Sequence, residues 1–307
     1  MRYYFAPMEG ITDSIYRRIH HKYFGGVDRY FMPFLSPSIH RKLTHKEDRE
    51  LPLADSVPFD AVPQVLTKVP EDFLWAATVC RDRGYDEVNL NVGCPSGTVI
   101  SKGKGSGMLR DPAALDAFLE AIFQSTPLPI SVKTRLGLEN PEEFPALLDI
   151  FNRYPIRELT IHPRVRKQFY DGSVHMDLFD HAVRHSQNSL CYNGDLNSLS
   201  QIAELAQQYP GLESVMLGRG LVGDPGMLTP GGTDVNILEQ FHNELLDAYT
   251  DAFGGGRNAM FRLKENWHML IVHFDGSEKL WKRLRKTTDL SEFKDITAQI
   301  FHTLPHK

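Results

Sequence analysis

The strongest constraint on the fold of this chain is a regular alternation of short apolar runs and amphipathic segments over about 220 residues. The apolar runs predict eight strands, at residues 3–8, 29–34, 61–66, 86–91, 130–134, 157–161, 189–193 and 213–218. The amphipathic segments between them predict helices, at residues 13–24, 70–83, 112–124, 141–153, 177–185 and 199–208. Eight strands that alternate with helices are typical of a (β/α)8 TIM barrel, an α/β fold.

An open, doubly wound sheet is the alternative that the same alternation allows. Such a sheet normally carries a glycine-rich turn directly after its first strand. Here the first strand runs into Pro7-Met8-Glu9-Gly10, which is no such turn, so we predict the barrel. Residues 35–60, with three prolines and mixed charge, predict either a lid or an irregular helical insertion.

The alternation stops at Thr229-Pro230-Gly231-Gly232-Thr233, which we interpret as a linker. Four segments beyond it have the period of helices, at residues 235–252, 257–273, 276–287 and 289–303. We therefore predict a barrel domain of residues 1–234 and a small C-terminal helical bundle of residues 235–307. From residue 257 onward the chain carries 10 Lys and Arg against 6 Asp and Glu, whereas the part before it carries 24 against 33. A basic tail on an acidic body is the charge distribution expected of a surface that binds phosphates. An ordinary helix face exposed to solvent would show the same distribution.

Composition excludes several classes of protein. No apolar run approaches the length of a membrane span, and the first residues lack the apolar stretch of a secretory leader. The three cysteines, Cys80, Cys94 and Cys191, show neither CxxC nor Cys/His metal spacing, which argues against structural zinc and for a reducing compartment. We expect a cytoplasmic monomer that binds neither a metal nor a membrane.

Polar residues gather where the predicted strands end. In a (β/α)8 barrel the carboxyl ends of the strands meet at one mouth, where the active sites of such barrels lie. The residues at these ends are Glu9, Gln64, Asn91, Cys94, Lys133, Arg135, His162, Arg164, Asn193-Gly194-Asp195 and Gly218-Arg219-Gly220. Each residue alone is explained by a surface or core role. Their common position at the strand ends predicts an active site. The glycines and the arginine after the last two strands fit a phosphate group, and Lys133 fits negative charge on a reduced ring.

Cys94 has the most specific setting of these residues. It follows the fourth predicted strand in a turn between Gly93 and Pro95, so the backbone sets the direction of the thiol. A cysteine that only fills a core would lie inside a strand or on a helix face. Lys102 and Lys104 follow among spaced glycines, which predicts an anion-binding lip. A functional role for Cys94 is therefore favoured over a packing role.

Several different short motifs follow one another along most of the chain. They are Ala6-Pro7-Met8-Glu9-Gly10-Ile11-Thr12-Asp13, Gln64, Leu90-Asn91-Val92-Gly93-Cys94-Pro95-Ser96, Gly105-Ser106-Gly107-Met108-Leu109, Asp111-Pro112, Ser131-Val132-Lys133-Thr134-Arg135-Leu136-Gly137, Ile161-His162, Asn193-Gly194-Asp195, Gly218-Arg219-Gly220, Arg262-Leu263-Lys264 and Trp267. Together they resemble the tRNA-dihydrouridine synthases, flavin enzymes that reduce a uracil in RNA. The Asn-x-Gly-Cys-Pro-Ser element is the most specific part of the resemblance.

The resemblance implies that FMN lies across the barrel mouth and that NADPH reduces it. The implied cofactor contacts are Pro7, Met8 and Glu9 from the first strand, Gln64, Lys133 and His162 around the ring, and Asn193, Gly194, Asp195, Gly218 and Arg219 at the phosphate end. The implied tRNA contacts are Asn91 at the uracil together with Arg135, Arg164, Lys102, Lys104, Arg262 and Lys264. The flavin would pass hydride to C6 of a uridine in the tRNA D-loop while Cys94 protonates C5. A thiol with an ordinary pKa of about 8.5 is still protonated at neutral pH and can act as this acid.

The chain departs from the family pattern in a few places. The family usually shows His-Gly-Arg-Thr after the sixth strand, where this chain has His162-Pro163-Arg164-Val165, and Val174-His175-Met176 differs just beyond. Ser96-Gly97-Thr98 also replaces a commoner basic pair. These loops are expected to touch the flavin phosphate or the RNA, so the departures bear on substrate choice more than on the reaction. The opening motif and the compact tail resemble most the bacterial subgroup that modifies the sixteenth tRNA nucleotide.

Two other functions stay open at this point. A flavin-dependent reductase of free pyrimidines would share the barrel, FMN and a loop cysteine, but it would not need a basic helical tail. A non-catalytic RNA-binding barrel would have lost the flavin, whereas Gln64, Lys133 and Arg219 are all present. The tRNA hypothesis requires that the target base leave the RNA stack and that the basic bundle bind tRNA phosphates.

Overall fold

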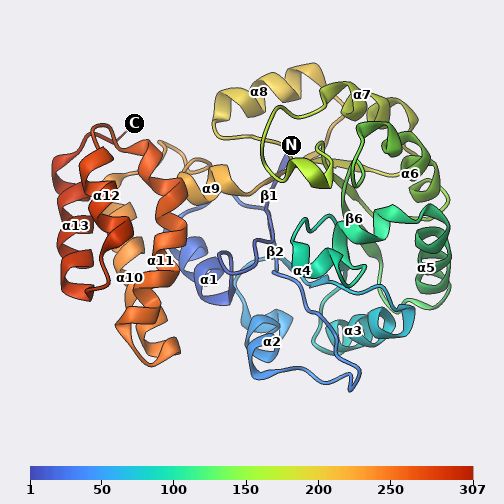
Figure 1. Ribbon diagram of the computed structural model, residues 1–307, viewed down its shortest axis with the longest axis horizontal. Helices are drawn as coiled ribbons and strands as arrows, with labels where there is room; N and C mark the ends of the chain where they lie inside the picture. The colour runs from blue at the N-terminus through green and yellow to red at the C-terminus, as the bar shows by residue number, and fades with distance from the viewer. Residues whose placement is uncertain (307) are drawn as a thin grey trace.

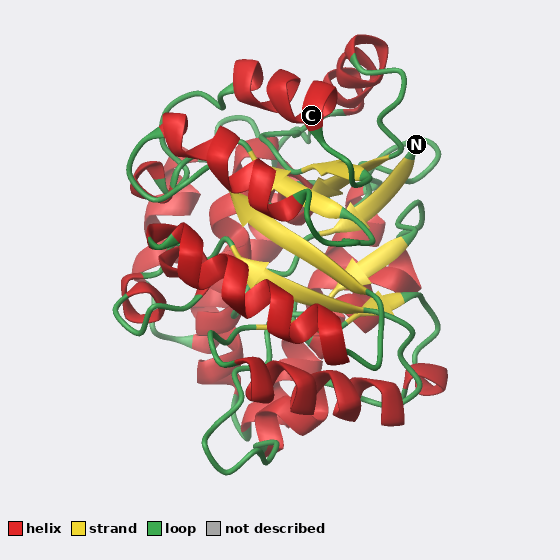
Figure 2. Cartoon of the chain, turned by 90° about the vertical axis from the view of Figure 1, so that its right-hand side faces the viewer, coloured by secondary structure: helices red, strands yellow, loops and turns green. Residues whose placement is uncertain are grey.

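The computed structural model, which describes residues 1–306, shows a barrel of parallel strands beside a bundle of helices (Figure 1). The strands are β1 (Arg2–Phe5), β2 (Arg29–Phe31), β3 (Ala61–Val62), β4 (Gln64–Val65), β5 (Val88–Val92), β6 (Ile130–Arg135), β7 (Leu159–His162), β8 (Leu190–Tyr192) and β9 (Ser214–Leu217). They pair in the order β3-β2-β1-β9-β8-β7-β6-β5-β4. Figure 2 shows the strands inclined side by side inside a ring of helices.

The sheet closes at Pro63, which divides the third predicted strand into two. β3 pairs with β2 through Ala61 and Tyr30, and β4 pairs with β5 through Gln64 and Asn89. Pro63 has no N–H group to donate to a ladder, but its carbonyl accepts the backbone N–H of Asn89 at 2.8 Å. Because β3 and β4 are consecutive parts of one strand, the order closes into an eight-stranded parallel barrel. The predicted (β/α)8 architecture is confirmed.

The outer helices lie where the amphipathic pattern predicts them. They are α1 (Ser14–Tyr23), α3 (Pro70–Asp82), α5 (Pro112–Ser125), α6 (Phe144–Phe151), α7 (Met176–His185) and α8 (Leu199–Gln208). The carboxylate of Asp13 accepts the Tyr16 N–H at 3.0 Å at the start of α1, and that of Asp111 accepts the Ala114 N–H at 3.1 Å at the start of α5. Caps that are visible in the sequence therefore fix where these helices begin.

Short helical pieces complete the loops around the barrel. Residues 35–60 contain α2 (His45–Glu50) and a 3₁₀ turn (Ala54–Ser56), so this segment is an irregular helical insertion. Around the mouth lie α4 (Gly97–Ile100), the 3₁₀ segment Gly105–Arg110 and α9 (Arg219–Gly223). A 3₁₀ turn (Pro141–Glu143) precedes α6, so the helix predicted from residue 141 begins one turn later than expected.

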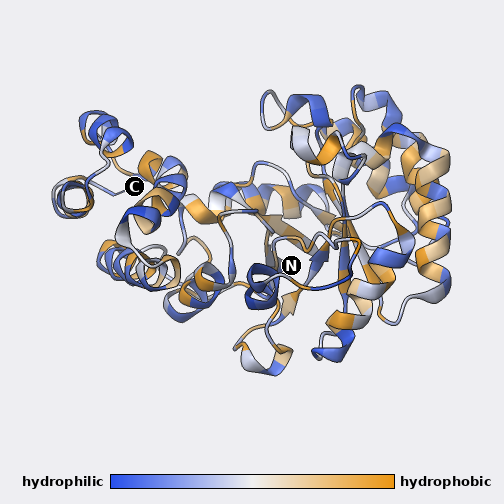
Figure 3. Ribbon diagram, turned by 60° about the horizontal axis from the view of Figure 1, so that its bottom comes forward, coloured by the Kyte–Doolittle hydropathy of each residue, from blue (hydrophilic) through white to orange (hydrophobic). Residues whose placement is uncertain are grey.

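The C-terminal region forms the four helices that the sequence predicts. They are α10 (Val235–Phe253), α11 (Gly256–Leu270), α12 (Glu278–Lys286) and α13 (Leu290–Thr303), and α11 continues as a 3₁₀ turn (Ile271–His273). In Figure 1 these helices stand to one side, with α1 and α9 between them and the barrel. Figure 3 shows that bundle helices and barrel helices alike carry both hydrophobic and hydrophilic residues, as helices with one buried face do.

An aromatic contact joins the bundle to the barrel. The ring of Phe241 on α10 packs edge-on against Tyr16 on α1 and against Phe24 just after it, with centroids 5.5 and 5.1 Å apart. The predicted linker is also anchored, because the Thr229 hydroxyl accepts the Gly25 N–H at 3.3 Å. Bundle and barrel residues belong to one continuous apolar core. The division at residue 234 stays a prediction.

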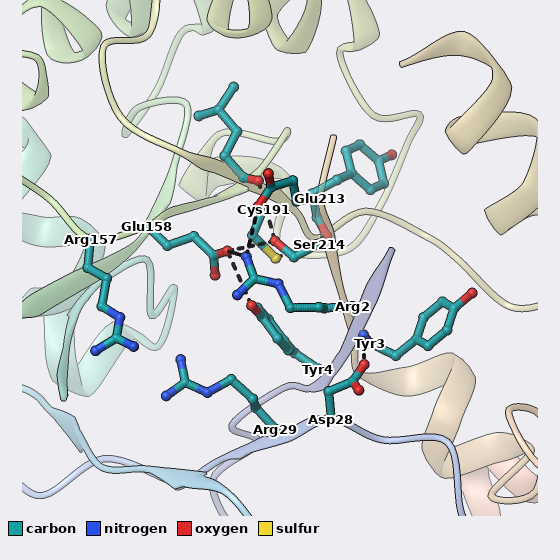
Figure 4. Close-up of polar contacts among 12 residues, drawn as sticks. Arg2, Tyr3, Tyr4, Asp28, Arg29, Arg157, Glu158, Cys191, Glu213 and Ser214 are labelled. Carbon is teal, nitrogen blue, oxygen red and sulfur yellow. Dashed lines mark hydrogen bonds and ion pairs between the residues drawn. The ribbon is translucent and has the colours of Figure 1, made fainter. Parts of the chain in front are cut away.

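The end of the barrel opposite the mouth is closed by a polar network. Figure 4 shows Arg2, Tyr4 and Ser214 gathered around the carboxylate of Glu158, which precedes β7. The hydroxyl of Ser214 donates to this carboxylate at 2.7 Å, that of Tyr4 at 3.3 Å, and the Arg2 guanidinium at 3.5 Å. Burial raises the pKa of Glu158 above its ordinary value. This network lies at the amino ends of the strands, opposite the mouth.

Candidate active site

A cavity of about 570 Å³ lies at the carboxyl ends of the strands. The predicted residues that line it are Pro7, Met8, Glu9, Asn91, Cys94, Lys133, Arg135, His162, Asn193, Gly194, Asp195, Gly218 and Arg219. They come from strand ends and loops that lie far apart in the sequence, and the parallel barrel brings them to one mouth. The predicted residues that do not line it are Gln64, Arg164, Lys102, Lys104, Arg262 and Lys264.

Hydrogen bonds with Asn91 and Ser106 hold the backbone of Cys94 from two sides. Its N–H donates to Oδ1 of Asn91 at 2.9 Å, and its carbonyl accepts both the hydroxyl and the N–H of Ser106, at 2.8 and 3.2 Å. Burial raises the pKa of the thiol, against the lowering effects of a hydrogen bond from the Ser96 backbone and of nearby cations. At neutral pH this side chain is therefore a protonated thiol at the edge of the cavity.

Lys133 on β6 presents a cation to the cavity. Among the described residues no hydrogen bond or ion pair reaches its ammonium group. Burial, and then the charge of Arg135, lower its pKa to about 8. Burial, and then the charges of Arg135 and Lys133, hold the pKa of His162 well below its ordinary value, so this imidazole is neutral. The centre of the mouth thus combines an unpartnered cation with a neutral ring.

Arg135 lines the cavity but is largely committed to the backbone. Its guanidinium donates to the carbonyls of Gly93 and Val165, each at 3.1 Å, and only 2% of the residue is exposed. Burial lowers its pKa to about 10, so it remains charged at neutral pH. Arg135 therefore joins the loop of Cys94 to the loop after β7.

Two arginines share one carboxylate where β8 and β9 end. Arg164 donates to Asp195 at 2.9 Å and through a second, shorter contact, and Arg219 donates to the same carboxylate at 2.7 Å. Although burial alone would raise the pKa of Asp195, its hydrogen bonds and charge contacts with Arg164 and Arg219 hold it below the ordinary value. Two guanidinium groups against one carboxylate leave an excess positive charge, which suits an anion.

Several predicted residues have partners outside the cavity. Nζ of Lys104 donates to the Ser36 hydroxyl at 3.2 Å, and Lys102 is exposed on the same rim. Burial lowers the pKa of Lys104, and the charges of Lys102 and Lys68 act in the same direction, whereas the carboxylate of Asp72 opposes them. These three lysines therefore lie near one another, with an acidic side chain among them.

Arg262 and Lys264, the two charged residues of the Arg-Leu-Lys motif, make different contacts. Arg262 donates to the carbonyl of Gly10 and pairs with Asp13 at 3.4 Å, so it braces the loop after β1 against α11. Lys264 is 8% exposed and donates to the carbonyl of Arg285 at 3.3 Å, as well as to that of Thr287. The structure thus places Arg262 near the mouth and Lys264 inside the bundle.

Several residues of the cavity wall were not predicted from the sequence. They are Phe34, Phe169, Tyr170, Glu265, His268 and Met269. Three of these come from α11, at spacings that put them on one helix face, so a periodicity signal existed but did not say what the face contacts. Tyr170 lies against Arg219 and Arg135, 4.5 and 5.3 Å from its ring centre, and stacks on His162 at 5.9 Å.

The residue before Tyr170 has an unusual backbone. Phe169 has φ +50°, which a bulky residue rarely adopts, and 41% of it is exposed. Its loop, which contains the departures from the family pattern, is held by the Arg164 guanidinium, a donor to the Gly172 carbonyl at 2.6 Å. Pro163 contributes through its carbonyl, which accepts the His175 N–H at 2.8 Å.

Within residues 1–306, no group of three or more His, Cys, Asp or Glu side chains is placed to hold a metal ion. No helix in the same range is long and apolar enough to cross a membrane.

Known proteins resemble this chain in sequence over most of its length. The sequence model of the family described as "Dihydrouridine synthase (Dus)" matches residues 4–249. A "Probable tRNA-dihydrouridine synthase" of Staphylococcus epidermidis is 30% identical over 235 residues, which cover 72% of this chain and 68% of the relative. A "Probable tRNA-dihydrouridine synthase 1" of Synechocystis is 25% identical and covers 97% of this chain and 86% of its own length.

Solved structures share the fold at low sequence identity. Morphinone reductase in complex with tetrahydroNAD superposes with a TM-score of 0.51 at 11% identity, covering 79% of this chain and 86% of that one. The old yellow enzyme homologue from Zymomonas mobilis gives 0.50 at 12% identity, covering 73% and 86%. These likenesses establish the barrel architecture alone.

Proposed function

Because this chain belongs to the dihydrouridine synthase family, we propose that it reduces a uridine in the tRNA D-loop to 5,6-dihydrouridine, with bound FMN and with NADPH as reductant. The observation that carries the proposal is Cys94, a protonated thiol fixed by the backbone at the edge of a cavity that also presents the unpartnered cation of Lys133. The predicted residues that line this cavity come from the ends of six different strands, and a purely structural role for each of them would leave this convergence to chance.

The residues present fit a phosphorylated flavin. A Cβ at Gly220 would meet the Leu196 carbonyl oxygen at 2.2 Å, so a side chain is excluded there, whereas one at Gly218 would make only ordinary contacts with Cβ of Ala6 and Sδ of Met8, each at 3.4 Å. Arg219 supplies a guanidinium beside them. Lys133, His162 and the residues of the first loop would hold the ring end, and Asn193, Gly194, Asp195, Gly218 and Arg219 the phosphate end. When bound, FMN supplies the hydride that reaches C6 of the uracil.

Cys94 is proposed as the acid that protonates C5. Hydride addition leaves negative charge on the C4–O4 side of the uracil, so a proton must be delivered at C5. A thiol whose pKa is raised by burial keeps its proton across the neutral range. The three hydrogen bonds that fix the Cys94 backbone leave the sulfur only rotation about the Cα–Cβ bond, which favours delivery at one atom.

Lys133 and Arg135 are proposed to stabilise negative charge in the mouth. Neither carries a carboxylate partner among the described residues, so their charges are available to a bound anion. Asn91 lies on β5, three residues before Cys94, and is proposed to face the uracil. The neutral ring of His162 contributes a hydrogen-bonding group without adding a further charge.

The tRNA is proposed to contact both sides of the mouth. Glu265, His268 and Met269 show that α11 of the bundle forms part of the cavity wall, so an RNA strand that delivers a base must pass over the bundle. Lys102 and Lys104 lie on the barrel rim. Arg262 remains a proposed tRNA contact, whereas the buried side chains of Arg164 and Lys264 are occupied by contacts within the protein. The flipped base requires single-stranded or distorted RNA at the target, which a D-loop supplies.

The proposal is tested on the full chain. We expect the purified protein to be yellow with the spectrum of oxidised FMN, to be bleached by NADPH without oxygen, and to be reoxidised by unmodified tRNA. Mapping dihydrouridine in the product should find it at the sixteenth nucleotide, and tRNA from cells that lack this protein should lack it there. A bacterial cytoplasm and a monomeric state belong to the same proposal and are checked by fractionation and light scattering.

Other outcomes would favour the competing functions. Turnover of free uracil or uridine at the rate seen with tRNA would identify a reductase of free pyrimidines. A colourless protein that takes up no FMN but binds tRNA would identify a non-catalytic RNA-binding barrel.

A further inference from the structure

A row of buried side-chain amides crosses the barrel beneath Cys94. Asn91 and Asn89 on β5 flank Gln64 on β4, and Ser131 on β6 ends the row. Nδ2 of Asn91 lies 2.7 Å from Oε1 of Gln64, Nε2 of Gln64 lies 2.8 Å from Oδ1 of Asn89, and Nδ2 of Asn89 lies 2.8 Å from the Ser131 hydroxyl. Exposure is 7% for Asn91, 1% for Gln64, 0% for Asn89 and 1% for Ser131.

The backbone fixes the direction of this row. Oδ1 of Asn91 accepts the N–H groups of Gly93 at 3.1 Å and Cys94 at 2.9 Å, and a backbone N–H can only donate. The other end of the Asn91 amide must therefore be its donor, which requires an acceptor oxygen on Gln64. The Gln64 amide then turns its nitrogen to Asn89, and Asn89 turns its own nitrogen to Ser131. Every amide in the row has one permitted orientation.

This arrangement gives Gln64 a definite task. If Asn91 rotated about its side chain, the N–H groups of Gly93 and Cys94 would lose their acceptor, and buried unpaired donors are costly. Gln64 prevents that rotation because its oxygen is the partner of the Asn91 donor. Chained hydrogen bonds also polarise one another, so each link strengthens the next.

We propose that Gln64 and Asn89 are positioning residues that set the place of the Cys94 thiol through Asn91. The inference rests on the proposed function for its catalytic meaning, but the placement itself is a property of this chain alone. In the structure Gln64 does not line the cavity, so its effect on Cys94 is transmitted through this row of hydrogen bonds.

The first measurement is alkylation of Cys94 by iodoacetamide in the flavin-free full chain, as a function of pH. Cys80 and Cys191 are fully buried, so the native protein offers one reactive thiol. We expect Gln64→Met and Asn89→Leu, which break the row, to change the second-order rate constant at least about threefold, with the larger change at Gln64. Asn89→Asp keeps the acceptor for Gln64 in either protonation state and should stay within about twofold of wild type.

Two controls separate positioning from general loss of packing. Ser131→Ala removes only the far end of the row, and Thr160→Val changes a fully buried hydroxyl on β7 outside it. Both should alkylate within about twofold of wild type even where thermal unfolding shows a loss of stability like that of Gln64→Met.

The second measurement divides the catalytic cycle. We expect NADPH to reduce the flavin of Asn89→Leu within about twofold of the wild-type rate, while reoxidation by tRNA slows about tenfold to a hundredfold. Wild-type alkylation rates in Gln64→Met and Asn89→Leu, or a parallel fall of both half-reactions in Asn89→Leu, overturn the proposal. If tRNA fails to reoxidise even the wild-type protein, the proposed function is wrong, and the alkylation series still decides the positioning role.

Discussion

Replacing Cys94 by alanine should separate the two halves of the proposed reaction. The hydrogen bonds that hold residue 94 involve its backbone N–H and carbonyl, so Cys94→Ala keeps them. The loss is one partly exposed thiol, which should cost no more than about 1 kcal/mol of unfolding free energy. FMN binding and reduction by NADPH should therefore persist. A positioned general acid contributes about a hundredfold to ten-thousandfold, so dihydrouridine formation should fall by that factor, or about 3–5 kcal/mol in activation free energy.

The assay follows flavin absorbance in a stopped-flow instrument without oxygen, first with NADPH and then with unmodified tRNA, and counts dihydrouridine in the product. Cys80→Ala is the matched control, because Cys80 is fully buried on α3, away from the mouth. It should leave both half-reactions at the wild-type rate even if it lowers the melting temperature. Dihydrouridine formation by Cys94→Ala at near wild-type rate would refute the assignment of the acid, and a loss of FMN binding would show that the thiol supports the site structurally.

Three further predictions concern charge and packing. Lys133 has a pKa of about 8 and is charged below it. FMN affinity, measured by fluorescence titration, should therefore weaken as the pH rises through this value, by up to about tenfold per pH unit. The Lys133→Met variant should show no such dependence. Asp195→Asn leaves Arg164, 1% exposed, without its carboxylate; we expect thermal unfolding to show a loss of about 1–3 kcal/mol, less than for a fully buried pair because the Asp195 side chain is 37% exposed. Phe241→Ala should lower the free energy of unfolding by about 3–5 kcal/mol, and barrel and bundle should still unfold together in one calorimetric transition. Two transitions, of which only one is shifted, would show that barrel and bundle unfold independently.

Much of the fold could be predicted because its signals are local. Buried parallel strands are short apolar runs, outer helices repeat every 3.6 residues, and capping residues such as Asp13 and Asp111 lie next to the helices they start. Polar residues at strand ends follow the same logic, since a parallel barrel brings every carboxyl end to one mouth. Lys133 and Cys94 could therefore be assigned to one cavity without knowledge of any contact. The division of the third strand was missed, although Pro63 is visible, because the run around it reads as one apolar strand.

The packing of distant segments decided the rest. The amphipathic pattern of α11 gives it a buried face, but only docking of the bundle on the barrel places Glu265 and His268 in the cavity wall and turns Lys264 toward the bundle interior. Gln64 was expected to touch the cofactor, yet whether its amide faces the mouth or a neighbouring strand depends on the register of β4 against β5. Sequence periodicity says which side of an element is buried. What that side meets is set by contacts between residues far apart in the chain, and no local pattern encodes them.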